Sequence, residues 1–159
     1  MTNSSKRILV VSDSHGNYTA LDRIVKGAGP FDILIHCGDG VTDLIHVNTE
    51  NKLLWRVPGN VDIHKVPHME RLIEVTLFEK NIIITHGDLF NVKSDLSGLK
   101  RLGGERRADY IFYGHTHRAA LTEGKVTCFN PGESNRGFYG IVEAGNEEWS
   151  FEHKRLKAP

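Results

Sequence analysis

Two histidines stand two residues apart at the end of an apolar run in the stretch YIFYGHTHRAA (110–120). His115 and His117 follow this run directly, just after Gly114. Residues i and i+2 of an extended chain lie on the same face, so both rings can point toward one spot beyond a strand. Asp13 and His15 repeat the spacing after an earlier apolar run. Imidazole and carboxylate groups placed in this way are typical ligands of a divalent metal ion.

Polar residues of the same kinds follow three other apolar runs. Asp39 comes after the run ILIH, Asn60 after LLWRVP, and His86 after NIIIT. Functional groups of open α/β folds gather beyond the carboxyl ends of the strands, so five strand ends can converge on one crevice. We therefore expect one cluster of seven candidate ligands: Asp13, His15, Asp39, Asn60, His86, His115 and His117.

The types of these side chains restrict the metal. Carboxylates and imidazoles suit Mn, Fe, Co, Ni or Zn better than Mg or Ca. Seven ligands are too many for one such ion, whereas two ions about 3.5–4 Å apart can share them if one aspartate bridges. Taken alone, each residue is more simply a hydrogen-bonded turn residue, and GN and GD are ordinary turn dipeptides. Their order at successive strand ends favours a binuclear site, because turns do not require imidazole.

The first third of the chain must position these residues with alternating strands and helices. Residues 8–11 and 33–36 are continuous apolar runs, typical of strands buried on both faces. Residues 18–26 have apolar side chains at helical spacing, and 41–48 are expected to form a short helix. Asn17 is predicted to cap the first helix, with contact to a substrate phosphate as the alternative. A third apolar stretch begins at residue 53 and again ends in a cluster of Gly, Asn and Asp.

The remainder of the chain changes in pattern. The pattern of residues 71–88 indicates two strands joined by a tight turn at 79–81. Residues 94–102 are predicted to form a helix with Ser94 or Asp95 near its N-cap. ADYIFYGHTH predicts another buried strand, and the tail, with turns at 123–124, 131–132 and 145–146, predicts antiparallel strands. We expect an α/β fold in one domain of residues 1–159, with a flexible N-terminus of about residues 1–6.

Composition names no macromolecular partner. Lys and Arg together number 20, as do Asp and Glu, so no net charge attracts nucleic acid or a membrane, and the basic stretch at 100–107 has no interleaved aromatics. Cys37 and Cys128 are isolated and are expected to be reduced and structural. The N-terminal apolar run is too short for a signal peptide or membrane span, and a cytoplasmic protein is the expectation. Neither GxGxxG nor GxxxxGK[ST] occurs.

Five motifs in order, DSHGN, CGDG, PGNVD, THGD and GHTH, followed by NPGES, resemble the calcineurin-like metallophosphoesterases, especially small cap-less phosphodiesterases of the YfcE type. The resemblance covers about residues 8–139. It implies two packed mixed β-sheets flanked by helices, and hydrolysis in which a metal-bound hydroxide attacks phosphorus in line. It further implies that one ion is held by Asp13, His15 and His117 and the other by Asn60, His86 and His115. Asp39 would bridge the two ions. Asp39, Asn60 and His115 would also be catalytic residues.

The sequence departs from the family at two positions. Many relatives have His where this chain has Val61, and that His is thought to protonate the leaving group. Asp62 and His64 are nearby candidates for this acid, although Asp62 matches the small phosphodiesterases and is better explained as a support for the ligands. Asp88 stands where YfcE-like relatives have His. It could orient His86, change the metal preference, or be an ordinary turn residue.

We therefore predict a binuclear metal-dependent phosphoesterase, foremost a phosphodiesterase for small esters. Its cofactors would be two divalent ions, Mn first, with Ni, Fe, Zn or Co as alternatives. The alternative function is a protein-interaction scaffold like the retromer subunit of the same fold, in which the ligand set is incomplete. This chain keeps every ligand, which favours the enzyme. The expected partner is a small phosphate ester rather than nucleic acid or a membrane, and the C-terminal strands offer an edge for a homo-oligomer.

Overall fold

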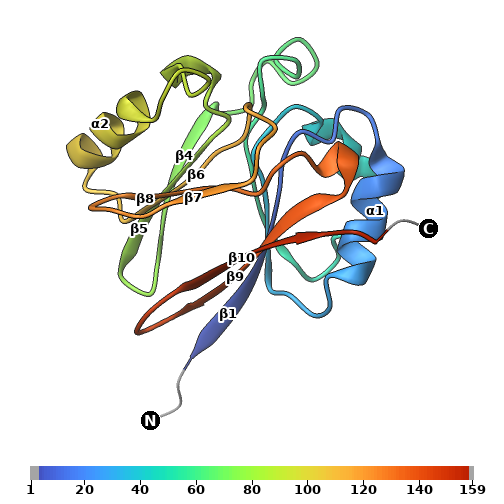
Figure 1. Cartoon of the computed structure of the whole chain (residues 1–159). Coiled ribbons are helices and arrows are strands. Elements are labelled where there is room, and N and C mark those ends of the chain that lie inside the picture. Colours follow the sequence, from blue (N-terminus) through green and yellow to red (C-terminus); the bar gives the residue numbers. More distant parts are fainter. Residues whose placement is uncertain (1–3, 158–159) are drawn as a thin grey trace.

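The computed structural model describes residues 4–157 as two five-stranded β-sheets that lie against each other, with helices outside them (Figure 1). The first sheet has the order β10-β9-β1-β2-β3 and the second the order β4-β5-β6-β8-β7. The strands of the first sheet are β1 (Ser5–Val11), β2 (Ile33–His36), β3 (Leu53–Arg56), β9 (Phe138–Gly145) and β10 (Ser150–Arg155). Those of the second sheet are β4 (Leu72–Leu77), β5 (Lys80–Thr85), β6 (Tyr110–Phe112), β7 (Ala120–Thr122) and β8 (Thr127–Asn130).

Both sheets are mixed, which confirms the fold class expected from the sequence. Strands β1, β2 and β3 are parallel, while β9 runs antiparallel to β1 and to β10. In the second sheet β5, β6 and β8 are parallel, and β4 and β7 are the antiparallel edges. The predicted antiparallel tail therefore forms two hairpins that join different sheets: β7 and β8 extend the second, β9 and β10 the first.

Residues 8–11 of strand β1 are buried on both faces, which explains their continuous apolar run. Ile8 and Val10 face the second sheet, where they share a cluster with Ile82 of β5. Leu9 and Val11 belong to a separate cluster on the opposite face of the sheet, which α1 covers. Alternate residues of a strand point to opposite faces, so the buried part of this strand, residues 8–11, is apolar on both faces, whereas Ser5, Lys6 and Arg7 at its start are not fully buried.

Helix α1 (Tyr18–Gly27) packs against the first sheet through Leu21 and Ile24, as its spacing predicted. Asn17 accepts the N–H of Ala20 at 3.1 Å, so it is the predicted N-cap. Residues Val41–His46, expected as a short helix, form a 3₁₀ turn, η1. Two further 3₁₀ turns are η2 (Asp88–Phe90) and η3 (Ser134–Arg136).

Helix α2 (Ser97–Arg106) covers the outer face of the second sheet and begins later than predicted. The predicted start at residue 94 is too early, because Asp95 Oδ1 accepts both the N–H and the hydroxyl of Ser97 and holds a local turn before the helix. Asp95, expected near the N-cap, lies next to the N-cap residue Leu96. The tight turn between β4 and β5 lies at Phe78 and Glu79, at the early edge of the predicted position.

The carboxyl ends of β1, β2, β3, β5 and β6 point to the same side of the molecule, the top in Figure 1. The loops that follow these strands therefore meet there. Of the segment expected to be a flexible N-terminus, Ser5 and Lys6 pair with β9, and residues 1–3 lie outside the described residues. Between residues 4 and 157 no helix is both long and apolar enough to cross a membrane.

Candidate metal centre

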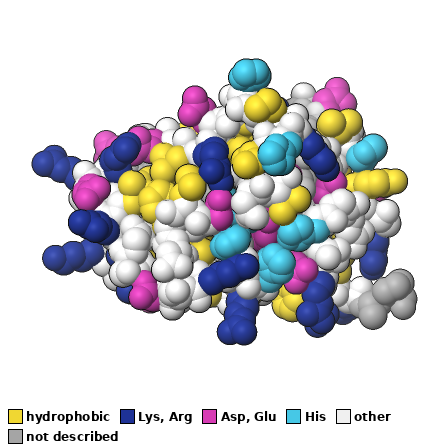
Figure 2. All heavy atoms as spheres, turned by 90° about the horizontal axis from the view of Figure 1, so that it is seen from above, with side chains coloured by type: hydrophobic (Ala, Val, Ile, Leu, Met, Phe, Trp, Pro, Cys, Tyr) yellow, Lys and Arg dark blue, Asp and Glu magenta, His cyan; other side chains and the backbone are white. Residues whose placement is uncertain are grey.

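Six of the seven predicted ligands come together in two groups beyond the strand ends. One group is Asp13, His15 and His117, and the other is Asp39, His86 and His115. Within each group the ligand atoms lie within 4.8 Å of one another. Figure 2 looks down on this side of the molecule, where histidine side chains gather with acidic ones between them.

Asn60, the seventh predicted ligand, lies in the exposed turn after β3. The next residue, Val61, donates its N–H to Asp39 Oδ1 at 3.0 Å. The turn that carries Asn60 therefore borders the second group.

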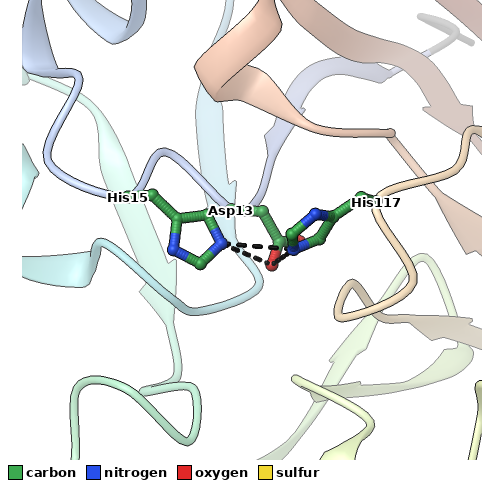
Figure 3. Close-up of side chains that lie close together, drawn as sticks. All are labelled: Asp13, His15 and His117. Carbon is green, nitrogen blue, oxygen red and sulfur yellow. Dashed lines mark hydrogen bonds and ion pairs between the residues drawn. The ribbon is translucent and has the colours of Figure 1, made fainter.

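The three side chains of the first group point toward one another (Figure 3). Asp13 Oδ1 lies 3.5 Å from Nε2 of His15 and 3.3 Å from Nε2 of His117, and these two nitrogens are 3.2 Å apart. An ion bound at about 2.1 Å from each ligand holds neighbouring ligand atoms about 3.0–3.4 Å apart. Asp13 Oδ1 is buried and has no hydrogen-bond partner. A buried carboxylate oxygen without a partner is costly, so this group fits a cation.

The second group has a comparable geometry. His86 Nε2 lies 3.2 Å from Asp39 Oδ2 and 3.2 Å from Nδ1 of His115. The other ring nitrogen of His86 donates to the backbone oxygen of Cys37 at 2.7 Å, which leaves Nε2 of the neutral ring as a lone-pair donor. Two imidazole nitrogens that face each other in this way can bind one cation.

The two groups are contiguous. Asp39 Oδ2 lies 3.9 Å from Nε2 of His15, and Asp13 Oδ1 lies 4.0 Å from Nε2 of His86. Both carboxylates therefore lie between the groups, and this geometry accommodates the bridge predicted for Asp39.

Electrostatics keep the Asp39 carboxyl ionised. Burial acts to raise its pKa, but the hydrogen bond and charge of His86, the N–H of Val61 and the charge of His15 outweigh burial and lower the pKa to about 2. Burial opposes a charge on His86, yet its contact with Asp39 raises the pKa of His86. Burial and the charges of His86 and Lys93 lower the pKa of His115. A metal ion that binds here must therefore compete with a proton on His86.

The backbone is strained at the ligands themselves. Five of the ten residues other than glycine with positive φ between residues 4 and 157 are candidate ligands. A left-handed conformation costs an L-residue about 1–2 kcal/mol, and such strain concentrates at functional sites. The five are Asp13 (55°), His15 (45°), Asp39 (58°), His115 (71°) and His117 (62°).

Two glycines allow the loops to approach each other closely. A Cβ atom on Gly59 would overlap Asp39 Oδ1, and one on Gly114 would overlap Ser12 Oγ. The PGN and YGHTH motifs therefore need glycine at these positions to leave room for the carboxylates.

Supporting residues that the sequence did not single out fix the ligands. Ser12 Oγ donates to Asp13 Oδ2 at 2.6 Å, and the N–H of His115 donates to the same oxygen at 3.1 Å. Glu133 Oε2 lies 3.7 Å from Nδ1 of His117. Glu133 belongs to the NPGES motif. A carboxylate commonly orients a ligating imidazole, so this acidic residue was the feature of the motif that could have indicated the role.

A fully buried histidine links the first two loops. His36 Nδ1 accepts the N–H of Gly38 at 3.0 Å, so its Nε2 donates to Ser14 Oγ at 3.1 Å. Ser14 in turn donates to Asp43 Oδ2 at 2.7 Å. Burial lowers the pKa of His36 to about 4, against the opposing charges of Asp62 and Asp43. The ring is therefore neutral and structural at neutral pH.

Asp62 is a buried anchor for two loops. Its Oδ2 accepts the N–H groups of Asp39 at 2.8 Å and Gly59 at 2.9 Å, and its Oδ1 accepts that of Gly40 at 2.9 Å. His64 is exposed in the same turn region. Both candidates for a general acid thus follow the third strand, but Asp62 faces the backbone of the ligand loops.

Asp88 forms no hydrogen bond or ion pair with His86. It pairs with the guanidinium of Arg71, which precedes β4. An ion pair with Arg71 was not among the roles considered for Asp88 from the sequence.

Comparison with known proteins agrees with the ligand motifs. A family model described as a calcineurin-like phosphoesterase superfamily domain matches residues 7–142. The "Probable metallophosphoesterase YsnB" of Bacillus subtilis is 34% identical over 128 residues, which cover 79% of this chain and 73% of that protein.

Solved structures share the fold. A conserved uncharacterized protein of Streptococcus pneumoniae, a predicted phosphoesterase, has a TM-score of 0.76 at 25% identity and covers 96% of this chain and 90% of its own. Vacuolar Protein Sorting 29 of Cryptosporidium parvum has a TM-score of 0.74 at 14% identity, over 96% of this chain and 99% of its own. The family match and the curated relative confirm what the five motifs predicted: this chain belongs to the calcineurin-like phosphoesterase superfamily.

Proposed function

We propose that the protein is a phosphodiesterase that hydrolyses small phosphate diesters at a centre of two divalent metal ions. The observation that supports this most is Asp13 Oδ1, a buried carboxylate oxygen without a hydrogen-bond partner, surrounded by imidazole nitrogens. Such a set suits Mn, with Ni, Fe, Zn or Co as alternatives. When bound, the ions would supply positive charge for the phosphoryl oxygens and would acidify water.

The chain's own residues hold and orient this centre in the proposal. Asp39 is ionised and lies between the groups, so it is the proposed bridge. His86 is oriented by its bond to the Cys37 carbonyl. The strained loop conformations are already set, so little ordering is needed when a phosphate ester arrives. Asp13, His15 and His117 would hold one ion, and Asn60, His86 and His115 the other.

The proposal includes a preference for good leaving groups such as aryl oxides. Val61, which is 53% exposed beside the centre, cannot donate a proton. Asp62 accepts backbone N–H groups on both oxygens, and a carboxylate with these partners is an acceptor rather than an acid. His64 remains the candidate proton donor on the exposed turn.

Reconstitution tests the proposal directly. The protein is stripped of metal, supplied separately with Mn, Ni, Zn, Fe or Mg, and assayed on an aryl phosphodiester and an aryl phosphomonoester. We expect metal-dependent turnover, faster on the diester, that falls at least about 100-fold in Asp39→Asn. Asp22→Asn, on the outer helix α1, is the matched control and should keep full activity. Failure of every metal with every ester would contradict the proposal.

A protein-interaction scaffold is the second candidate, because large apolar side chains are exposed near the ligand loops, including Ile45, Val61 and Leu89. The likeness to Vacuolar Protein Sorting 29 shows a shared fold only. If two ions bind per chain without turnover, and if a partner then binds equally well to wild type and Asp39→Asn, the scaffold replaces the enzyme.

A further inference from the structure

A hollow of about 470 Å³ lies on the outer face of the second sheet, on the side covered by α2. Its apolar walls come from Val92, Leu96, Tyr113 and Ala120. Tyr113 is only 2% exposed, so its ring is a fixed floor. Volumes of about 300–1,000 Å³ with apolar walls and a few polar groups are typical of small-ligand sites.

The hollow borders the candidate metal centre through one residue. Thr116 lines it and stands between His115 and His117, which belong to different ligand groups. Asn130 fixes this border, since its amide donates to Thr116 Oγ1 at 3.0 Å and to the Gly114 oxygen at 3.1 Å. A ligand with its phosphate at the centre can therefore extend into a preformed hollow.

Two cations stand at this hollow, and no carboxylate lines it. They are Lys93, from the loop before α2, and Arg118, directly after the GHTH motif. Neither side chain has an ion-pair partner within residues 4–157. Figure 2 shows hydrophobic side chains exposed beside the histidines on the α2 side. Apolar walls with two unpaired cations suit a flat organic group that carries its own negative charge.

We propose that this hollow is the substrate subsite, and that it binds the organic substituent of the phosphate ester as an aromatic or similarly flat apolar group bearing a second anionic group, held by Lys93 and Arg118. The inference rests on the proposed function for the phosphate end of the ligand. The second anionic group is inferred from Lys93 and Arg118, and the apolar group from the apolar walls of the hollow. None of these residues is a candidate metal ligand.

Strand β7 provides matched variants for a test. Ala120 lines the hollow, whereas its neighbour Leu121 points to the opposite face and pairs with Phe129. Ala120→Phe therefore fills the hollow, and Leu121→Phe adds aromatic bulk to the same edge strand outside it. Thr122→Phe, on the same face as Ala120, replaces the first variant if that one does not fold.

The probes are phosphonates, whose C–P bond does not hydrolyse, so binding is measured without turnover. Calorimetry compares methylphosphonate, benzylphosphonate and 4-carboxybenzylphosphonate on the Mn-supplied protein. We expect 4-carboxybenzylphosphonate to bind at least about tenfold more tightly than methylphosphonate. Ala120→Phe should abolish this preference and Leu121→Phe should keep it. In the double variant Lys93→Gln, Arg118→Gln, the preference for 4-carboxybenzylphosphonate over benzylphosphonate should fall about fivefold.

Each outcome decides between the two proposals. Equal dissociation constants for the three phosphonates, or a preference unchanged in Ala120→Phe, would overturn the subsite and leave the hollow to another occupant such as a protein. If methylphosphonate fails to bind while Ala120→Phe still weakens binding of the carboxylated probe, the subsite stands and the metal centre fails. If no ester is turned over but the preference is present and depends on Ala120, only the proposed catalysis is contradicted.

Discussion

At the scale of single residues, Asp13 uses its two carboxylate oxygens differently. Oδ2 is saturated by the Ser12 hydroxyl and the His115 N–H, whereas Oδ1 faces the imidazoles without a hydrogen bond. The donors on Oδ2 fix the rotation of the carboxylate and so aim Oδ1 into the group. Ser12 therefore supports the candidate metal centre although it is not itself a candidate ligand.

Removing the Ser12 hydroxyl should weaken metal binding while every ligand stays in place. We expect Ser12→Ala to lower the affinity for Mn about 10- to 100-fold in a calorimetric titration, because partners of ligands contribute on this scale. Ser97→Ala is the matched control. Ser97 Oγ also donates to an aspartate at 2.6 Å, but this aspartate, Asp95, is not a candidate ligand. Equal affinities in wild type and Ser12→Ala would show that Asp13 needs no such support.

Neutral His36 makes the metal-free protein sensitive to acid. Its pKa falls from the usual 6.5 to about 4 on folding, so between these pH values the unfolded chain binds a proton that the folded chain does not. Stability contributed by the neutral ring is therefore complete above pH 6.5 and declines as pH falls toward 4, by about 3 kcal/mol.

NMR of the His36 ring and denaturant unfolding between pH 7 and 5 measure this effect. The raised pKa of His86 acts in the opposite direction, because its stabilisation is lost as pH rises. The difference in slope between wild type and His36→Gln isolates the contribution of His36. A His36 ring that becomes protonated near pH 6.5 in the folded protein would contradict the burial argument.

At the scale of elements, the loops after parallel strands carry the site, and Asp62 joins two of them. Asp62→Asn places an NH₂ group against backbone N–H donors. We expect the free energy of unfolding of the metal-free protein to fall by about 2 kcal/mol. Asp109→Asn is the control, because Asp109 accepts a single exposed N–H from Asn81, and its loss should be under about 1 kcal/mol. Full stability with a selective loss of turnover would instead identify Asp62 as an acid.

Local sequence patterns predicted most elements and singled out the residues of the candidate metal centre, because both depend on short-range rules. The buried parts of β1, β2, β5 and β6 are mostly apolar, so the Asp and His residues close behind these strands marked the candidate site. The assignment of the two tail hairpins to different sheets was not predictable, since pairing between distant strands leaves no local signal. The start of α2 was missed because the side chain of Asp95 competes with the helix. The contacts of His36 and Asp62 span 22 and 23 residues, so local patterns did not predict them, and the supporting role of Asp62 was expected only from the family resemblance.

At the scale of the whole molecule, each ligand group draws side chains from both sheets. Asp13 and His15 follow β1 of the first sheet, whereas His117 follows β6 of the second. Asp39 follows β2, and it meets His86 from the end of β5. Ions bound at these groups would link the two sheets at one end of their shared core.

Metal binding should therefore stabilise the entire fold rather than one loop. Binding to the folded state alone adds about 2.7 kcal/mol per site when the free metal is 100 times its dissociation constant. We expect Mn to raise the unfolding temperature and to slow amide exchange at the carboxyl ends of both β1 and β6, with EDTA reversing both effects. Asp39→Asn, which removes the carboxylate between the groups, should lose most of the gain, while Asp22→Asn should keep it. Protection confined to one sheet would contradict this arrangement, because each ligand group contains side chains from both sheets.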